Sequence, residues 1–359
     1  MEGGLQGGEE GVYALTQYLI DTFGGRFDFE YRIAVVGPAS LNTNYGAIFS
    51  QALRKGKRLV GSEDWAARGG SGSVLLRAHN VVGIIFGGRP RKREFPGEDV
   101  ANFRTAKAIV EGVHKKPYNE VVSEKTTKYR FNPPKLNTGG TFGGNYPAEG
   151  DFTPILNWSM PYIPKEERIK IHENIMKHYW EPFNEEAIKP KHWTTCGEPC
   201  PVVCKKYRNG HHVEYEPYEA NGPPLSGSIS LRASEISVHA VDSMGFDAIE
   251  FGGTAAWVLE LVHRGLLKPE EVGLSGRPEF TKEALLEKPV EASEVNAKLV
   301  AELAHRVAFA ENEVARIIGL GKRKASVIFD ERFKDRLDYG GESFKDHAVF
   351  TLSARTGGR

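Results

Sequence analysis

The residues RIAVVGP, from Arg32 to Pro38, form a short run of apolar and β-branched side chains that ends in a Gly-Pro pair. A second run of the same kind is VVGIIFGG, from Val81 to Gly88. Short apolar runs bounded by Gly or Pro are typical of buried strands. Between them, the composition of AIFSQALRK favours a helix, and GSEDWAARGGSGS predicts a loop that leads into a short helix. This order predicts a β/α unit of a mostly parallel sheet.

One helix is expected before the first strand, because Leu15, Leu19 and Phe23 recur at helical spacing and two glycines follow. One or two strands cannot form a sheet alone. We therefore expect residues 1–91 to be an α/β remnant, the C-terminal part of a domain whose other strands lie outside this chain.

From about residue 92 the strand patterns stop and helical patterns dominate. SLRASEISVHAVDSMG predicts a helix, and TAAWVLELVHRG predicts another with Thr254 as N-cap and Gly265 as its stop. SEVNAKLVAELAHRV carries one apolar stripe, formed by Val295, Leu299, Leu303 and Val307. We expect a mainly α-helical domain over residues 92–340, and in residues 341–359 the start of a third domain that begins like a strand.

The composition excludes some partners. The 359 residues contain 47 Lys plus Arg and 47 Asp plus Glu, so a general nucleic-acid or anionic-membrane surface is not expected. No apolar run approaches the roughly 20 residues of a membrane span. Met1 is followed by acidic residues instead of a basic and then apolar signal, which predicts a cytoplasmic protein.

All three cysteines lie in one short stretch, Cys196-Gly-Glu-Pro-Cys200-Pro-Val-Val-Cys204. Pro and Gly break regular backbone and let the sulfur atoms converge, which favours a metal centre in a compartment that keeps thiols reduced. An iron–sulfur cluster is the leading interpretation. Zinc held with the help of His211 or His212, and unliganded buried thiols, are the alternatives.

Three carboxylates, Glu214, Glu216 and Glu219, alternate with tyrosines in VEYEPYEANGPP. A carboxylate held among aromatic rings tends to have a raised pKa and can act as a general acid or base. From these residues alone, an ordinary acidic surface loop is the better interpretation.

Two further motifs contain groups that bind polar ligands. Asp242 and Asp247 flank the turn at Gly245, where two carboxylates can accept N–H donors from a heterocycle, and FGGT follows as a possible phosphate-binding helix start. WAARGGSGS places Arg68 among glycines, although it lacks the P-loop and Rossmann spacings. Taken singly, a helix stop and a plain loop explain both motifs.

Together and in order, WAARGGSGS, CGEPCPVVC, EYEPYEANGP and DSMGFDAIEFGGT resemble the tungsten- or molybdenum-dependent aldehyde ferredoxin oxidoreductase family. The resemblance extends from about residue 30 to about residue 345. It implies an α/β pterin-binding domain followed by helical domains, which enclose a metal held by two pyranopterins beside a [4Fe-4S] cluster. Within the family, the stretches GTFGGNY and CGEPCPVVCKK are more similar to the branch that contains broad-specificity tungsten oxidoreductases and their benzoyl-CoA reductase relatives.

The resemblance assigns roles to residues of this chain. Cys196, Cys200 and Cys204 match three ligands of the family's cubane cluster. The family's active-site carboxylate matches Glu219. The family's first pterin-binding motif matches Asp242, Phe246 and Asp247, and its pterin-phosphate loop matches Trp65, Ala67 and Arg68.

The chain also departs from the family pattern. Its spacing is C-x3-C-x3-C, where many members have C-x2-C-x3-C, and Ile236 stands where some members carry a Glu that binds an iron shared between subunits. The fourth cluster Cys, the second Asp/Gly pterin motif and the first strands have no counterpart. We therefore expect a fragment or one piece of a split enzyme, with a second polypeptide supplying the missing C-terminal part.

The function that the resemblance implies is oxidation of an aldehyde substrate to a carboxylic acid, with electrons leaving through the cluster to ferredoxin or a ferredoxin-like subunit. Glu219 would handle a proton, and the chain alone is expected to be incomplete as an enzyme. The alternative is a non-catalytic iron–sulfur subunit, for electron transfer or assembly, that has lost the pterin site.

Overall fold

The computed structural model describes residues 10–27, 31–54, 56–58, 63–87, 103–118, 120–121, 149–188, 206–208, 211–213, 222–337 and 343–348. The strands in these ranges are β1 (Tyr31–Val36), β2 (Ile48–Arg54), β3 (Lys57–Arg58), β4 (Asp64–Ala66), β5 (Gly83–Gly87), β6 (Lys206–Arg208) and β7 (His211–Val213). The α-helices are α1 (Gly11–Phe23), α2 (Pro38–Asn42), α3 (Ser71–His79), α4 (Phe103–His114), α7 (Lys165–Ile175), α8 (Glu181–Phe183), α10 (Gly222–Leu225), α11 (Leu231–Met244), α12 (Ala248–His263), α13 (Pro269–Val272), α14 (Lys282–Glu287), α15 (Pro289–Ala308), α16 (Glu313–Ile318) and α17 (Lys322–Arg332).

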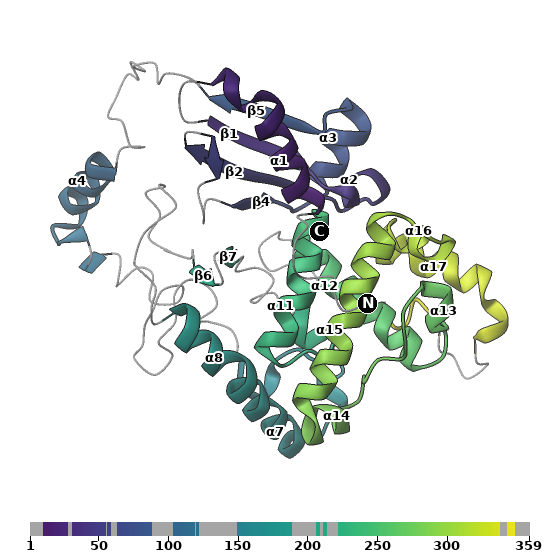
Figure 1. Cartoon of the computed structure of the whole chain (residues 1–359). Helices are drawn as coiled ribbons and strands as arrows, with labels where there is room; N and C mark the ends of the chain where they lie inside the picture. The colour runs from purple at the N-terminus through teal and green to yellow at the C-terminus, as the bar shows by residue number, and fades with distance from the viewer. Residues whose placement is uncertain are drawn as a thin grey trace.

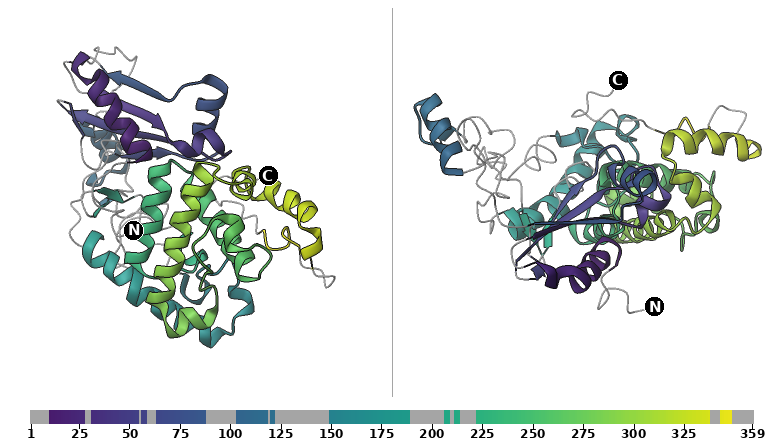
Figure 2. Two further views of the ribbon diagram at one scale, coloured as in Figure 1. Left: turned by 45° about the vertical axis from the view of Figure 1, so that its right-hand side comes forward. Right: turned by 90° about the horizontal axis from the view of Figure 1, so that it is seen from above.

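A small sheet with helices is followed by a mainly helical region, which confirms the predicted fold class (Figure 1). Figure 2 shows the sheet seated on one end of the helical region. No described helix is both long enough and apolar enough to cross a membrane.

The expectation of a mostly parallel sheet is wrong. The strand order is β3-β2-β1-β5 with β4 also on β2, and every described pair in this sheet is antiparallel. The reason is that AIFSQALRK, predicted as a helix, contains β2. Its Phe49, Gln51 and Leu53 alternate onto the buried face, but the polar Gln51 hides this period in the sequence. Gln51 Nε2 is buried there and donates to Glu63 Oε1 at 3.0 Å.

The predicted first helix is confirmed as α1, which covers one face of the sheet. Val12, Leu19 and Ile20 of this helix pack with Ile33 and Val35 of β1 in one apolar cluster. The second predicted strand is present as β5, but it is not buried. Ile84 and Phe86 are exposed, whereas Ile85 between them packs against the apolar cluster, because successive side chains of a strand lie on opposite faces.

The predicted long helices of the second region are present, with one wrong start. α12 begins at Ala248, not at Thr254, because the side chain of Asp247 caps it by accepting from the Glu250 N–H at 3.3 Å. Its predicted stop is confirmed, since Gly265 has φ +78° just after the helix. The stripe of α15 is buried at Leu299, Leu303 and Val307, whereas Val295 is exposed.

The last described segment, residues 343–348, forms a turn, and the rest of the stretch expected to begin like a strand lies outside the described residues. Phe344 is fully buried against Phe329 and Phe333, and its carbonyl accepts the Trp257 indole N–H at 3.0 Å. Residues 343–348 are thereby fixed to α12 and α17.

Candidate functional site

The end of the sheet meets the turn between α11 and α12, and this junction gathers the predicted cofactor residues that the structure describes. The loop before β2 joins the turn through two backbone hydrogen bonds. Ala47 N–H donates to the Gly245 carbonyl at 2.7 Å and Asp247 N–H donates to the Tyr45 carbonyl at 2.8 Å, so that Gly46 and Phe246 pair as an antiparallel bridge. The turn is thus held as an extension of the sheet.

The α11–α12 turn combines a glycine stop with two buried carboxylates. Gly245 ends α11 with φ +77°, and its N–H donates to the Asp242 carbonyl at 3.0 Å, as in an ordinary glycine stop. The side chains of Asp242 and Asp247 are both buried, 8% and 5% exposed. Carboxylates are hydrogen-bond acceptors, the kind of group that N–H donors of a polar heterocycle bind.

The WAARGGSGS segment lies against this turn from the sheet side. Trp65, in β4, donates its indole N–H to the Asp242 carbonyl at 3.4 Å. Arg68 follows the half-buried Ala67, and its Nε lies 4.0 Å from Asp247 Oδ1. The structure therefore brings the two sequence motifs, far apart in the chain, into contact. Arg68 is 37% exposed, so its guanidinium still borders solvent.

The side chain of Phe246 is part of the apolar core at this junction. Its ring is 1% exposed and lies 4.4 Å from the Phe251 ring and 5.6 Å from the Tyr45 ring, measured between centroids. We infer that this side chain anchors the turn, while its neighbours Asp242 and Asp247 offer polar groups.

Sequence reasoning missed two charged residues of this junction. Glu250, in the first turn of α12, and Lys322, at the start of α17, act on one another electrostatically. Burial raises the pKa of Glu250 and lowers the pKa of Lys322, because both charged forms lose solvation. Burial, with the charge of Glu250, also raises the pKa of Tyr45 well above its usual value.

The FGGT segment does not start a helix. Gly252, Gly253 and Thr254 lie inside α12, so their N–H groups belong to the helix interior. The phosphate site expected at a helix start there is therefore wrong.

Cys196, Cys200, Cys204 and Glu219 lie outside the described residues. The structure describes elements that follow them in sequence: β6 begins two residues after Cys204 and packs against the π-helical turn Asn184–Ile188. Pro223, four residues after Glu219, lines a small apolar cavity of about 30 Å³ with Val241 and Phe251. Within the described ranges, no group of three or more His, Cys, Asp or Glu side chains could hold a metal ion.

The described part of the junction suits the polar parts of an anionic pterin cofactor. Asp242 and Asp247 are acceptors for ring N–H groups, and Arg68 is a cation for a phosphate. The backbone of the junction is also closely packed, because a Cβ added to Gly37 would come within 2.2 Å of the Met244 carbonyl oxygen. The residues present fit such a group.

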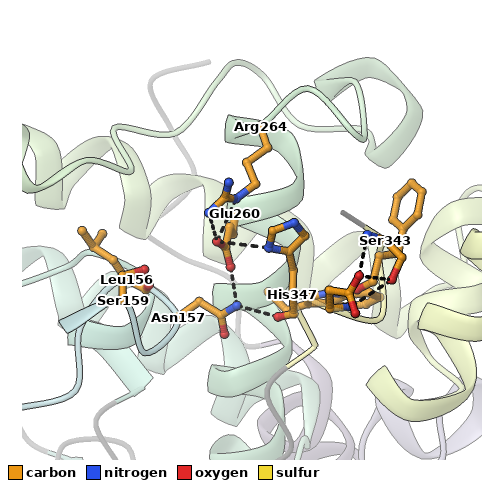
Figure 3. A network of polar contacts seen from close by, with 10 residues as sticks. Leu156, Asn157, Ser159, Glu260, Arg264, Ser343 and His347 are labelled. Carbon is orange, nitrogen blue, oxygen red and sulfur yellow. Dashed lines mark hydrogen bonds and ion pairs between the residues drawn. The ribbon is translucent and has the colours of Figure 1, made fainter. Parts of the chain in front are cut away.

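A second polar cluster lies at the other end of α12 (Figure 3). Glu260 accepts from Arg264 Nε at 2.9 Å and from Asn157 Nδ2 at 2.5 Å, and its Oε1 lies 3.4 Å from His347 Nδ1. Burial alone would raise the pKa of Glu260, but the hydrogen bonds from His347, Asn157 and Arg264 lower it below its usual value.

This second cluster has a structural role. Leu156, Asn157 and Trp158 are consecutive residues with positive φ of 44°, 49° and 70°, a costly backbone that Asn157 holds through Glu260 and the His347 carbonyl. Both oxygens of Glu260 are engaged with donors of the chain itself. The cluster ties residues 156–158 and 343–348 to α12, with Glu260 at about 20 Å of helix length from Asp247 in the junction.

The sequence of this chain is similar to proteins of one known family. A model of the aldehyde ferredoxin oxidoreductase family, domains 2 and 3, matches residues 119–341. The glyceraldehyde-3-phosphate:ferredoxin oxidoreductase of Pyrococcus furiosus is 77% identical over 345 residues, which are 96% of this chain and 52% of that protein. The tungsten-containing aldehyde ferredoxin oxidoreductase of Pyrococcus horikoshii is 28% identical over 269 residues, 70% of this chain and 37% of that protein.

A solved structure has a similar fold. The active-site complex BamBC of benzoyl-coenzyme A reductase contains a chain that matches with a TM-score of 0.52 at 13% identity, over 91% of this chain and 44% of that chain. This chain spans about half the length of the first relative and a smaller share of the other two proteins.

Proposed function

Because the chain belongs to the aldehyde ferredoxin oxidoreductase family, we propose that it acts in the oxidation of an aldehyde to a carboxylic acid with ferredoxin as electron acceptor. The family model covers residues 119–341 and confirms the resemblance read from the motifs. The observation that carries the activity is the 77% identity to a glyceraldehyde-3-phosphate:ferredoxin oxidoreductase across nearly the whole chain. We therefore propose glyceraldehyde-3-phosphate as the aldehyde and the cytoplasm as the location.

The reaction balances with water as the oxygen donor. One aldehyde and one water give one carboxylic acid, two protons and two electrons, and two ferredoxins take one electron each. A tungsten or molybdenum ion held by two pyranopterins, when bound, supplies the two-electron redox chemistry and polarises the carbonyl group.

The junction residues would bind and orient this cofactor. Asp242 and Asp247 would accept N–H donors of a pterin ring, and Arg68 would bind its phosphate, with Trp65 and Ala67 shaping the loop. The contact of Trp65 and Arg68 with the Asp242–Asp247 turn supports this proposal, because one ligand could reach both motifs at once. Phe246 would fix the turn from the core side.

Two further roles rest on residues outside the described ranges. Cys196, Cys200 and Cys204 would hold three irons of a [4Fe-4S] cluster that passes electrons on one at a time. The Glu219 carboxylate would accept a proton as water attacks the aldehyde. The domain limits 1–91, 92–340 and 341–359 belong to the same proposal.

An anaerobic assay tests this function. The protein, purified from cells supplied with tungstate together with any polypeptide that accompanies it, is mixed with ferredoxin and glyceraldehyde-3-phosphate, and the visible absorbance of ferredoxin is followed. We expect substrate-dependent reduction and much slower reduction with unphosphorylated aldehydes. A preparation that contains tungsten, pterin and iron but reduces no ferredoxin with any aldehyde would refute the proposal.

A further inference from the structure

Lys322 is a buried lysine at the edge of the junction. α17 starts with three consecutive basic residues, Lys322, Arg323 and Lys324, and the first is 7% exposed whereas the other two are exposed. Burying an ammonium group costs free energy unless a carboxylate or other acceptor compensates it. The position of Lys322 therefore calls for an explanation that its two neighbours do not need.

The ammonium group of Lys322 lies over the first turns of α12. A Cβ added to Gly253 would come within 2.7 Å of Lys322 Nζ, so the missing side chain of this glycine makes room for the ammonium. Gly253 is three residues after Glu250, on the same face of the helix. The ammonium of Lys322 thus lies over the face of α12 that also carries Glu250.

Glu250 is acted on by charges from three parts of the chain. The cations are Lys322 from α17 and, with a smaller effect, Arg68 from the loop before α3, while Asp247 on its own helix repels it. The charge of Glu250 also acts on the buried Tyr45. Two carboxylates and two cations therefore act on one another here, and Arg68, 4.0 Å from Asp247, is the member of the group that borders solvent.

We propose that Lys322 is a positioning residue for Arg68: by neutralising Glu250, it keeps the Arg68 guanidinium directed outward for the anionic phosphate of the cofactor. This inference rests on the proposed function, which assigns Arg68 to that phosphate. If Lys322 were absent, Arg68 would be the one cation left to interact with both Glu250 and Asp247. An Arg between two carboxylates forms strong charge-assisted hydrogen bonds with them. Its guanidinium is then no longer available to bind the phosphate of the cofactor.

The test is a double-mutant cycle between Lys322 and Arg68, read as the rate at which the purified protein loses pterin and tungsten on gel filtration. Lys322→Met and Arg68→Ala are each expected to speed this loss at least tenfold. In the Arg68→Ala background, Lys322→Met is expected to add less than twofold, because the lysine acts through the arginine. Lys324→Met is the matched control and should retain cofactor like wild type.

Gly253→Ala gives a second way to disturb the lysine while keeping all four charges. Its Cβ must displace Nζ, so cofactor loss should again accelerate, and again only where Arg68 is present. The unfolding midpoint of each variant is measured alongside, so that a folding defect is recognised and Gly253→Ala replaces any Lys322 variant that does not fold.

The outcomes separate the two proposals. If wild type holds tungsten and pterin but Lys322→Met and Gly253→Ala retain them equally well, or if the effects of Lys322→Met and Arg68→Ala multiply, the positioning role is overturned and the proposed function stands. If wild type holds neither tungsten nor molybdenum with pterin, both proposals fall.

Discussion

Glu219 is the residue on which the proposed proton transfer depends. Glu219→Gln keeps the size and shape of the side chain but removes the proton acceptor, so kcat should fall roughly 10²- to 10⁴-fold. Tungsten, pterin and iron contents should stay unchanged. Steady-state kinetics with glyceraldehyde-3-phosphate checks this, with Glu216→Gln as the control from the same segment. Near-normal turnover of the Glu219 variant would return this residue to the role of a surface carboxylate.

The three cysteines give a second prediction at the scale of single residues. Replacing any one of Cys196, Cys200 or Cys204 by Ser should sharply lower iron incorporation during anaerobic reconstitution, because each thiolate holds one corner of the cubane. His211→Ala and His212→Ala should leave iron unchanged. One zinc per molecule, lost in the His variants, would support the zinc interpretation instead.

Single residues also show what the sequence can and cannot predict. Asp242 and Asp247 stand out in the sequence because they flank a glycine turn, and Arg68 stands out because of its glycine-rich loop. Only the structure shows that Arg68 lies beside Asp247. Glu250 and Lys322 give no such signal. Lys322 is the first of three basic residues, a pattern typical of an exposed face. Its burial beside Gly253 of α12 arises from tertiary packing that the sequence does not show.

At the scale of elements, one ion pair fixes α13 to the turn after α17. Arg336 donates two hydrogen bonds to the Glu271 carboxylate, at 2.6 and 2.7 Å, and these lower the pKa of Glu271 from 4.5 to about 2. A carboxylate whose pKa is lowered by folding stabilises the fold above its unfolded pKa, and this contribution is lost as the pH falls towards the folded pKa.

Glu271→Gln should therefore lower the free energy of unfolding by about 1 to 3 kcal/mol at pH 7. The difference from wild type should shrink as the pH falls from 5 towards 3. Urea unfolding at several pH values measures it, with Glu270→Gln as the exposed neighbouring control. A difference that stays constant from pH 7 to pH 3 would show that the ion pair is not its cause.

The strand β2 shows why part of the sheet could not be predicted. Ala, Leu, Gln, Arg and Lys in AIFSQALRK have high helix propensity, yet pairing with β1 on one edge and with β3 and β4 on the other makes it a strand. The apolar alternation is broken by Gln51, whose partner Glu63 lies beyond the next strand. The long helices α11, α12 and α15 were predictable because each buries a stripe or a whole surface over many residues.

At the scale of the whole molecule, the contact between the sheet and the helical region depends on close backbone approach at Gly37. Gly37→Ala would place a Cβ 2.2 Å from the Met244 carbonyl oxygen, so it should lower the free energy of unfolding by about 1 to 3 kcal/mol and loosen the cofactor junction. Gly112→Ala, in α4 with no atom within 4 Å of its added Cβ, is the control and should be neutral or stabilising. Equal stability of the two variants would contradict the tight junction.

The central claim is that the junction between the sheet and the α11–α12 turn holds a metal–pterin cofactor beside an iron–sulfur cluster. The most direct measurement is the metal and pterin content of the anaerobically purified protein with any polypeptide that accompanies it. We predict tungsten or molybdenum with two pterins per metal, together with iron and sulfide. Iron and sulfide without pterin would contradict the claim and would favour a non-catalytic iron–sulfur subunit.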